Sequence, residues 1–258
     1  MEFRCRRIGK VYVGGNGGVH ALEDVTFSAI AEQFVCIVGP SGCGKTTLLK
    51  IIAGLVTPTL GTLEFAGAAE GNRPRAALVF QEHGLFPWMT VLDNVAFGLE
   101  MQGVPRPERR DRARAFIDKV GLSSFIRSYP HELSVGMQQR VGIIRAFVSN
   151  PRVLLLDEPF GSLDAQTRLV LQDELLRIWK DDRKLVIHVT HDIEEAVRLG
   201  DRVLVMTGRP GRIREDITIP LGRPREVSSR AAAEASEIRW HIWKLLEHDV
   251  RKGLWIAG

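Results

Sequence analysis

Short apolar runs and longer helical patterns alternate along much of this chain. Three runs rich in valine, leucine and isoleucine have the length of buried strands: residues 34–38, 153–156 and 184–190. A helical pattern closed by Gly54 follows the first run. After the second run, Leu171, Leu175 and Ile178 fall on one face of a helix. Strands that alternate with helices in this way predict an α/β core.

Residues 88–149 have a different pattern, in which helices dominate. Apolar residues at Ala113, Phe116, Ile117 and Val120 follow the helical spacing, and Gly121 closes that helix. A second helix begins after a serine that can cap it, and an Asn-Pro pair at residues 150–151 stops it. The pattern therefore predicts a helical insertion in the α/β core.

The two ends of the chain have patterns of their own. Residues 1 to about 38 and 60–80 alternate strand-like pieces with glycines, including the glycine-rich stretch at residues 14–18. From Pro220 a polar linker leads into a last helix that carries Ile238, Ile242 and Leu245 on one face, with Trp240, Trp243 and Trp255 near it. We expect this helix to cover core surface, and a regulatory role is the alternative.

Composition narrows the cellular setting of the chain. Its 258 residues carry a formal net charge of +4, which is compatible with a membrane surface or a nucleic acid as partner and requires neither. Three cysteines without a C-x-x-C pair indicate a reducing compartment. No apolar stretch approaches the length of about 18 residues that a membrane span needs, and no signal peptide is evident. We expect a cytosolic protein.

The most informative motif is a glycine-rich loop between the first predicted strand and its helix. This phosphate loop consists of Gly39, Pro40, Ser41, Gly42, Cys43, Gly44, Lys45, Thr46 and Thr47. It fits G-x-x-x-x-G-K-[ST], in which backbone N–H groups and the helix N-terminus surround phosphates. We expect Lys45 to reach the β- and γ-phosphates and Thr46 to hold Mg²⁺.

Two acidic residues follow the second predicted strand. Asp157 and Glu158 come directly after residues 153–156. Ligands of parallel sheets bind beyond the carboxyl ends of the strands, so Asp157 is placed to bind Mg²⁺, directly or through water. Glu158 could polarise an attacking water.

Three further polar positions are weak signals on their own. His191 follows the third predicted strand, where it could bond a γ-phosphate, although an isolated histidine there is more often part of a turn. Gln81 follows a strand-like run, and its amide could ligate metal or water. Ser134 and Gly136 begin a helix and form a second anion site, which suggests that another subunit completes the nucleotide site.

Taken in order, these motifs resemble those of the ATP-binding subunit of ABC transporters, over roughly residues 3–220. The phosphate loop matches Walker A, and residues 153–158 match Walker B with its glutamate. Gln81 matches the Q-loop glutamine, residues 133–137 match the LSGGQ-type signature, and His191 matches the switch histidine. The Walker A, Walker B and switch-histidine assignments imply that Lys45, Glu158 and His191 are the catalytic groups.

The resemblance assigns two further residues and a fold. Asp164 ends a D-loop match at residues 161–164, and Tyr12 lies where the family stacks an aromatic ring on adenine. The implied fold is a RecA-like P-loop NTPase core with an antiparallel β subdomain and an inserted helical subdomain at about residues 88–149. The ATPase domain would span residues 1–220, and residues 221–258 would form a C-terminal linker and helix.

The family implies ATP and Mg²⁺ as cofactors and a head-to-tail dimer, which we expect to be a homodimer. Each ATP would lie between the Walker A segment of one subunit and the signature of the other, with Thr46, Gln81 and Asp157 around the metal. Binding would close the dimer and hydrolysis would reopen it. The Q-loop region would contact permease subunits in the membrane.

A finer resemblance is to the nitrate/sulfonate/taurine importer subfamily. It is carried by residues 81–95, by residues 201–206 and by Arg-Pro-Gly-Arg-Ile at residues 209–213. It implies uptake of a small anion, an extracytoplasmic solute-binding protein in the complex, and a peripheral position on the cytoplasmic face of the inner membrane. It assigns a branch of the family, and the substrate stays open.

Two other classes of protein fit less well. Soluble ABC ATPases of DNA repair carry long coiled coils between their motifs, and no sustained heptads separate Lys45 from Asp157. GTPases read guanine with N-K-x-D, and the chain has no Asn-Lys pair. An importer subunit for another small solute is a further alternative, and we expect no nucleic acid partner.

Three positions depart from the common pattern or add to it. Val135 replaces the first signature glycine and Met137 the final glutamine. If position 135 requires a positive φ, valine would be strained there, ATPase activity would be reduced, and Val135→Gly would raise turnover. Cys43 lies within the phosphate loop, where a lowered thiol pKa would make it a target of alkylation that ATP prevents. The alternative is a passive small residue.

Overall fold

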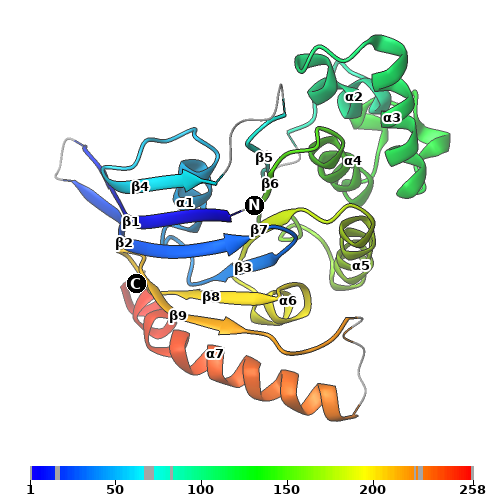
Figure 1. Ribbon diagram of the computed structural model, residues 1–258. Helices are drawn as coiled ribbons and strands as arrows, with labels where there is room; N and C mark the ends of the chain where they lie inside the picture. The colour runs from blue at the N-terminus through cyan, green and yellow to red at the C-terminus, as the bar shows by residue number, and fades with distance from the viewer. Residues whose placement is uncertain are drawn as a thin grey trace. The chain divides into compact units, whose positions relative to one another are not determined.

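A computed structural model describes residues 2–14, 18–66, 73–81, 84–223, 225 and 229–256 (Figure 1). The chain divides into two compact units, which we describe separately. Unit 1 comprises Met1–Gly67 and Leu185–Gly258, and unit 2 comprises Ala68–Lys184.

The core of unit 1 is a mostly parallel sheet with the strand order β7-β3-β8-β9. Its strands are β3 (Phe34–Val38), β7 (Leu185–Thr190), β8 (Arg202–Met206) and β9 (Ile213–Thr218). Strand β3 pairs in parallel with β7 and β8, and β9 is antiparallel to β8. Every residue of β3 and β7 is buried, which explains their continuous apolar sequences and confirms both as strands.

The helices of unit 1 are α1 (Lys45–Ile52), α6 (Ile193–Leu199) and α7 (Ser229–Ile256). Gly54, just beyond α1, has a φ of +76°, as expected of a glycine that ends a helix. Helix α7 contacts α6 and β8, in agreement with a helix that covers core surface. Among the α7 side chains that the structure describes, Ile242 and Leu246 are buried, so the apolar face includes the predicted Ile242 and then Leu246 in place of Leu245. The side chain of Trp255 lies outside the described residues.

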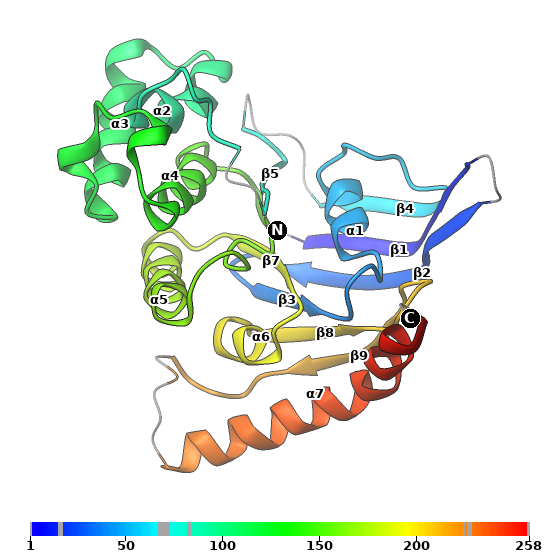
Figure 2. The same cartoon turned by 180° about the vertical axis from the view of Figure 1, so that it is seen from behind.

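A second sheet in unit 1 is antiparallel and has the order β2-β1-β4. Its strands, β1 (Glu2–Tyr12), β2 (Val19–Ile30) and β4 (Leu60–Phe65), lie side by side in both views (Figures 1 and 2). Phe3 on β1 packs against Phe27 and Phe65 of the two neighbouring strands, with ring centroids 5.8 and 5.1 Å away. The expected antiparallel β region is confirmed, whereas residues 15–17 of the glycine-rich stretch lie outside the described residues.

The described residues of unit 2 form a strand pair and four α-helices. Strand β5 (Ala76–Val79) pairs in parallel with β6 (Val153–Asp157), and β6 is entirely buried. The helices are α2 (Val91–Met101), α3 (Arg106–Lys119), α4 (Val135–Val148) and α5 (Ala165–Asp181), with 3-10 turns at Ser123–Phe125 and Pro130–Glu132. Helices α2 to α4 fall between the two strands in sequence, which confirms the helical character of residues 88–149.

Candidate functional site

The phosphate loop of unit 1 connects β3 to α1 and depends on glycine at two turns. Gly42 and Gly44 have φ values of +74° and +107°, a region that other residues rarely adopt. A Cβ atom on Gly44 would also lie 2.7 Å from the carbonyl oxygen of Ala21 and 2.8 Å from a methyl carbon of Leu22. The backbone of the loop is therefore fixed by its conformation and by the packing beneath it.

Lys45 is the first residue of α1 and is held close to the loop. Only 5% of this residue is exposed, and its ammonium group donates hydrogen bonds to the carbonyl oxygens of Gly39 and Pro40, at 2.8 and 3.1 Å. Ser41 in the loop and Thr46 in the first turn of α1 are exposed residues that carry hydroxyls. A buried ammonium beside a helix N-terminus, with hydroxyls around it, suits a phosphorylated ligand.

Cys43 does not fit the expectation of a reactive thiol. The residue is 1% exposed, and its sulfur lies in the core, 3.0 Å from where a Cβ atom on Gly39 would be. Alkylation requires an accessible thiolate, so burial opposes it. The passive interpretation of Cys43 replaces the reactive one.

His191 lies at the same edge of the unit 1 sheet as the phosphate loop. The register of β3 and β7 pairs Val38 with Thr190, so both strands end together and His191 follows directly. Asp192 caps α6 by accepting hydrogen bonds from the N–H groups of Glu194 and Glu195, at 2.8 and 3.2 Å. The exposed imidazole of His191 is therefore presented by a well-anchored turn.

Tyr12 and Arg209 are the remaining residues of unit 1 that belong to the candidate site or contact it. Tyr12 ends β1 and is 40% exposed, with the Lys10 ammonium 5.1 Å from the centre of its ring. Arg209, in the loop after β8, donates from Nε and Nη2 to the carbonyl oxygen of Gly42, at 3.3 and 3.2 Å. The second contact was not predicted, because the two residues are far apart in sequence.

In unit 2, the acidic pair lies at the carboxyl end of β6 as predicted. Asp157 is the last residue of the strand and is 6% exposed. Glu158 is half-buried and has a φ of +46°, an unfavourable conformation for a residue with a side chain. Its carbonyl accepts a hydrogen bond from the N–H of Gly161 at 3.1 Å, and the Gln81 amide nitrogen lies 3.7 Å from where a Cβ atom on Gly161 would be. Gln81 therefore lies beside the turn that carries Glu158.

The donor types of these residues fit Mg²⁺. This ion binds oxygen and usually keeps several waters, with one or two protein carboxylates and the substrate phosphates as its other ligands. In unit 2, Asp157 offers a carboxylate and Gln81 an amide oxygen, and in unit 1, described by itself, Thr46 offers a hydroxyl. Among the described residues, no group of three or more His, Cys, Asp or Glu side chains could hold a metal by itself. A single carboxylate is sufficient for a metal that arrives with a nucleotide.

The signature segment, residues 133–137, begins α4. Ser134 caps the helix, and its hydroxyl accepts a hydrogen bond from the N–H of Met137 at 3.3 Å. Gly136 faces α5 so closely that a Cβ atom would lie 3.2 Å from a methyl carbon of Thr167. Val135 lies in the first turn of α4 and is 49% exposed. It is not among the residues with positive φ, so the proposed backbone strain at this position is absent.

Asp164 caps α5 with its side chain. Its Oδ1 accepts hydrogen bonds from the N–H groups of Gln166 and Thr167, at 3.1 and 3.0 Å. Hydrogen bonds from the side chain and backbone of Thr167 lower the pKa of the Asp164 carboxyl. The residue is exposed. Its hydrogen bonds show that it caps α5, a role that requires no nucleotide.

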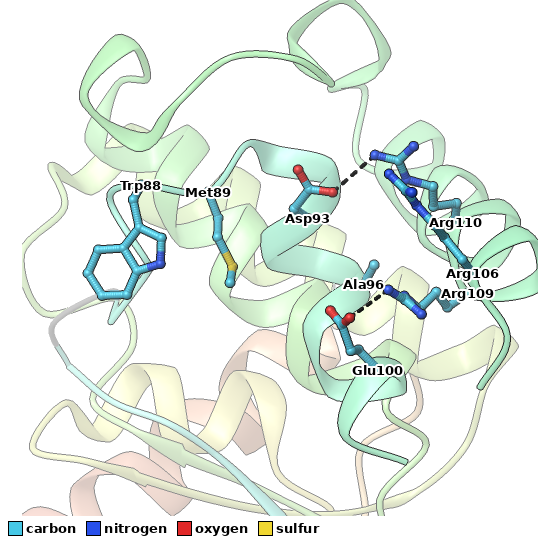
Figure 3. Close-up of a pocket in the computed structure, with 8 residues that line it drawn as sticks. All are labelled: Trp88, Met89, Asp93, Ala96, Glu100, Arg106, Arg109 and Arg110. Carbon is cyan, nitrogen blue, oxygen red and sulfur yellow. Dashed lines mark hydrogen bonds and ion pairs between the residues drawn. The ribbon is translucent and has the colours of Figure 1, made fainter. Parts of the chain in front are cut away.

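An open cleft of about 410 Å³ lies between α2 and α3 of unit 2 (Figure 3). Its lining residues are Trp88, Met89, Asp93, Ala96, Glu100, Arg106, Arg109 and Arg110. Two ion pairs cross it, Arg110 to Asp93 at 3.2 Å and Arg109 to Glu100 at 2.6 Å. Trp88 is 70% exposed at the rim. The neighbouring Glu82 and His83 lie outside the described residues.

The segment before α2 is anchored by a buried asparagine. The Asn94 amide donates to the carbonyl oxygens of Phe86, Met89 and Thr90, each at 3.1 Å. Its carbonyl oxygen accepts from the N–H of Phe86 at 2.9 Å. This network fixes the backbone on both sides of Trp88, so the exposed indole is presented by a rigid segment.

No helix in the described part of the chain has the length and apolar character needed to cross a bilayer.

Comparison with known proteins agrees with these motifs. The model of the ABC transporter family matches residues 22–161. The nitrate import ATP-binding protein NrtD of Synechocystis is 46% identical over 86% of this chain and 84% of its own length. The taurine import ATP-binding protein TauB of Yersinia pestis is 45% identical over 80% of this chain and 81% of its own. A solved dimeric ATP-binding cassette with bound ADP and Pi superposes with a TM-score of 0.74 and 32% identity, over 85% of this chain and all of that one.

Proposed function

This chain belongs to the ABC transporter family of ATP-binding proteins and is an ATPase of the P-loop NTPase fold, and we propose that it energises uptake of a small anion such as nitrate, sulfonate or taurine. The observation that carries the proposal is the phosphate loop, with its two left-handed glycines and buried lysine, in a chain similar to two anion importers. These relatives differ in substrate at nearly equal identity to this chain, so the similarity supports the subfamily and not one anion.

In the proposed mechanism, ATP is bound through its phosphates and its base. Backbone N–H groups of the phosphate loop and the Lys45 ammonium bind the phosphates, because fixed donors stabilise the charge that develops during phosphoryl transfer. Thr46, Gln81 and Asp157 would hold Mg²⁺, which neutralises phosphate charge when it is bound. Tyr12 stacks on adenine through its exposed ring.

Glu158 and His191 are the proposed residues nearest to the reaction. Glu158 orients or activates the attacking water, a role that a half-buried carboxylate at a strand end can perform. His191 contacts the γ-phosphate from its turn at the end of β7. Lys45 completes the catalytic set by stabilising negative charge on the transferred group.

The proposed active assembly is a head-to-tail homodimer. Ser134 and Gly136 would contact the nucleotide bound by the other subunit, and Asp164 would lie near them. Two observations support an interface on this part of unit 2. The similar solved cassette is dimeric, and Val135, Leu169 and Val170 are all about half exposed although they are apolar.

We propose that the cleft between α2 and α3 accepts a cytoplasmic helix of a permease subunit. The exposed indole of Trp88 at the rim and the two ion pairs that cross the cleft give it the mixture of apolar and charged groups typical of a docking surface. The chain would then act at the cytoplasmic face of the inner membrane as a peripheral subunit. An extracytoplasmic solute-binding protein would supply the substrate.

The first test compares the purified chain with its Glu158→Gln variant, by steady-state ATPase activity and by oligomeric state with ATP and Mg²⁺. We expect the variant to lose about a hundredfold or more in turnover and to remain as an ATP-bound dimer. Lys45→Ala is the control and should lose nucleotide binding. A Glu158→Gln variant that hydrolyses ATP like the parent would contradict the assigned role.

The substrate requires a second measurement. The chain is reconstituted in vesicles with its permease subunits and solute-binding protein, and ATPase activity is followed with nitrate, sulfonates or taurine. Stimulation by one of these anions would identify the substrate. Stimulation by none of them would favour an importer of another solute.

A further inference from the structure

The loop between β8 and β9 in unit 1, Thr207–Arg212, is tied together internally. The N–H of Thr207 donates to the carbonyl oxygen of Arg212 at 2.9 Å, and the N–H of Arg212 donates to the hydroxyl of Thr207 at 3.0 Å. The Thr207 hydroxyl also lies 3.0 Å from the carbonyl oxygen of Gly208. A loop fixed at both ends in this way can hold a side chain in one place.

This loop also lies against the phosphate loop. The N–H of Gly211 donates to the carbonyl oxygen of Ala21, and the N–H of Glu23 donates to that of Gly211, both at 3.0 Å. A Cβ atom on Gly211 would lie 2.1 Å from the carbonyl oxygen of Cys43, so only glycine permits this approach. The Thr207–Arg212 loop therefore forms part of the support beneath the phosphate loop.

From this support, Arg209 reaches the turn of the phosphate loop. Its two donor nitrogens bond the carbonyl oxygen of Gly42, while the N–H on the other side of that peptide, from Cys43, donates to the carbonyl oxygen of Pro40 at 3.3 Å. The Gly42–Cys43 peptide is thus held from both sides. Gly42 has the permissive backbone of a glycine, so this peptide could rotate without such contacts.

We propose that Arg209 is a positioning residue for the nucleotide, acting through the carbonyl group of Gly42. The N–H groups of a phosphate-binding loop can converge on an anion only when the carbonyls of neighbouring peptides face away from it. Arg209 holds one such carbonyl with a planar, two-nitrogen donor. The guanidinium also adds a permanent positive charge beside the loop. This inference rests on the proposed phosphate-binding role of the loop.

Arg212 offers a matched control within the same loop. It is exposed and positively charged like Arg209, but it pairs with Glu23 at 2.6 Å and has no bond to Gly42 among those observed. Removing either arginine takes away one surface cation from the same six-residue segment. Only Arg209→Ala also removes the contact with the phosphate loop.

The test measures the Kd of a fluorescent ADP analogue, the KM and kcat for ATP, and the thermal unfolding midpoint. Arg209→Ala should raise Kd and KM about fivefold, with kcat within about twofold of the parent, because hydrogen bonds to a preorganised loop affect binding first. Arg209→Lys should recover part of the loss, since it keeps the charge but replaces the planar pair of donor nitrogens with a single nitrogen. Arg212→Ala should leave Kd within about twofold.

Each contrary result has a distinct meaning. Unchanged Kd and KM in Arg209→Ala, or an equal loss in Arg212→Ala, would overturn the inference. A lower unfolding midpoint and lower kcat with unchanged KM would do the same, since those changes indicate a purely structural contact. Lys45→Ala separates the two proposals: it should abolish ADP binding, and if it does not, the assignment of the phosphate loop itself fails.

Discussion

The helix that follows the phosphate loop and the helix that follows the signature segment begin in opposite ways. Helix α1 has Gly44 at its N-cap, which offers no side chain to the N–H groups of the first turn. Helix α4 has Ser134 at the same position, and its hydroxyl accepts from the N–H of Met137. Helix α5 likewise has Asp164, whose carboxylate accepts from two N–H groups. One helix start is left to a ligand, whereas the other two are satisfied internally.

This difference assigns nucleotide binding to the start of α1 and contact with a second subunit to the start of α4. A helix without a capping side chain is stabilised by an anion at its N-terminus, so α1 and its loop are prepared to bind phosphate within one chain. The start of α4 is already capped and can fold without a ligand. Its exposed residues, Ser134 and Val135, are then available to a second subunit. We therefore expect changes at α1 to affect nucleotide affinity, and changes at α4 to affect turnover.

Gly44→Ala should give the largest effect. Alanine would be strained at a φ of +107° and its Cβ atom would lie 2.7 Å from a backbone oxygen, so we expect a loss of about 3 kcal/mol in unfolding free energy and no measurable ADP binding. Gly54→Ala is the control, because it also has a positive φ, but no atom lies within 4 Å of the new Cβ. It should cost about 1 kcal/mol and keep ADP affinity. Denaturant unfolding and ADP titration decide the outcome, and normal ADP binding by Gly44→Ala would contradict the rigid-loop argument.

Ser134→Ala should have a smaller effect on stability and a selective effect on activity. Loss of the cap should cost about 1 kcal/mol of unfolding free energy. Turnover should fall while ADP affinity of the isolated chain stays unchanged, because Ser134 is proposed to serve the other subunit. Thr90→Ala removes an equivalent cap from α2, where the Thr90 hydroxyl accepts from the N–H of Asp93 at 3.2 Å. It should cost similar stability and leave turnover intact, so an equal loss of turnover in both variants would assign the effect to stability alone.

Much of this arrangement could be predicted because it is local in sequence. The apolar runs predicted β3, β6 and β7, whose complete burial requires continuous hydrophobic residues. Gly54 and Gly121 were expected to end helices, and both have positive φ. The phosphate loop and the cap at Ser134 followed from residue types at fixed spacing.

The parts that could not be predicted depend on contacts between distant segments. Arg209 and Gly42 are separated by 167 positions, and nothing near either residue indicates their contact. Cys43 looked reactive from its neighbours in sequence, but packing against residues from elsewhere in unit 1 buries it. The left-handed backbone of Glu158 and the helical backbone of Val135 were also hidden, because side-chain preferences favour neither strongly enough to be decisive.

Asp164→Asn should separate the cap from its charge. Hydrogen bonding lowers the pKa of the Asp164 carboxyl in the folded chain, so the deprotonated form is favoured by folding. The resulting stability is present above the ordinary carboxyl pKa of about 4 and is lost as the pH falls through the folded value. Asparagine also caps helices well, so the variant should resemble the parent at pH 7 and lose less stability between about pH 5 and pH 3. Unfolding measured across that range checks this, and parallel curves for the two proteins would refute it.

Val135→Gly should have the smallest effect. Because Val135 has a helical backbone in the first turn of α4, glycine relieves no strain, and we expect turnover within about twofold of the parent and a loss of about 0.5 kcal/mol in unfolding free energy. Val135→Ala distinguishes the remaining explanation, since it removes the exposed branched side chain and keeps a helix-forming backbone. A several-fold rise in turnover in both variants would place the effect of Val135 at the subunit surface. A rise in Val135→Gly alone would mean that the segment must leave its helical conformation during catalysis. The start of α4 would then depend on a ligand as that of α1 does, and the distinction between a capped α4 and an uncapped α1 would end.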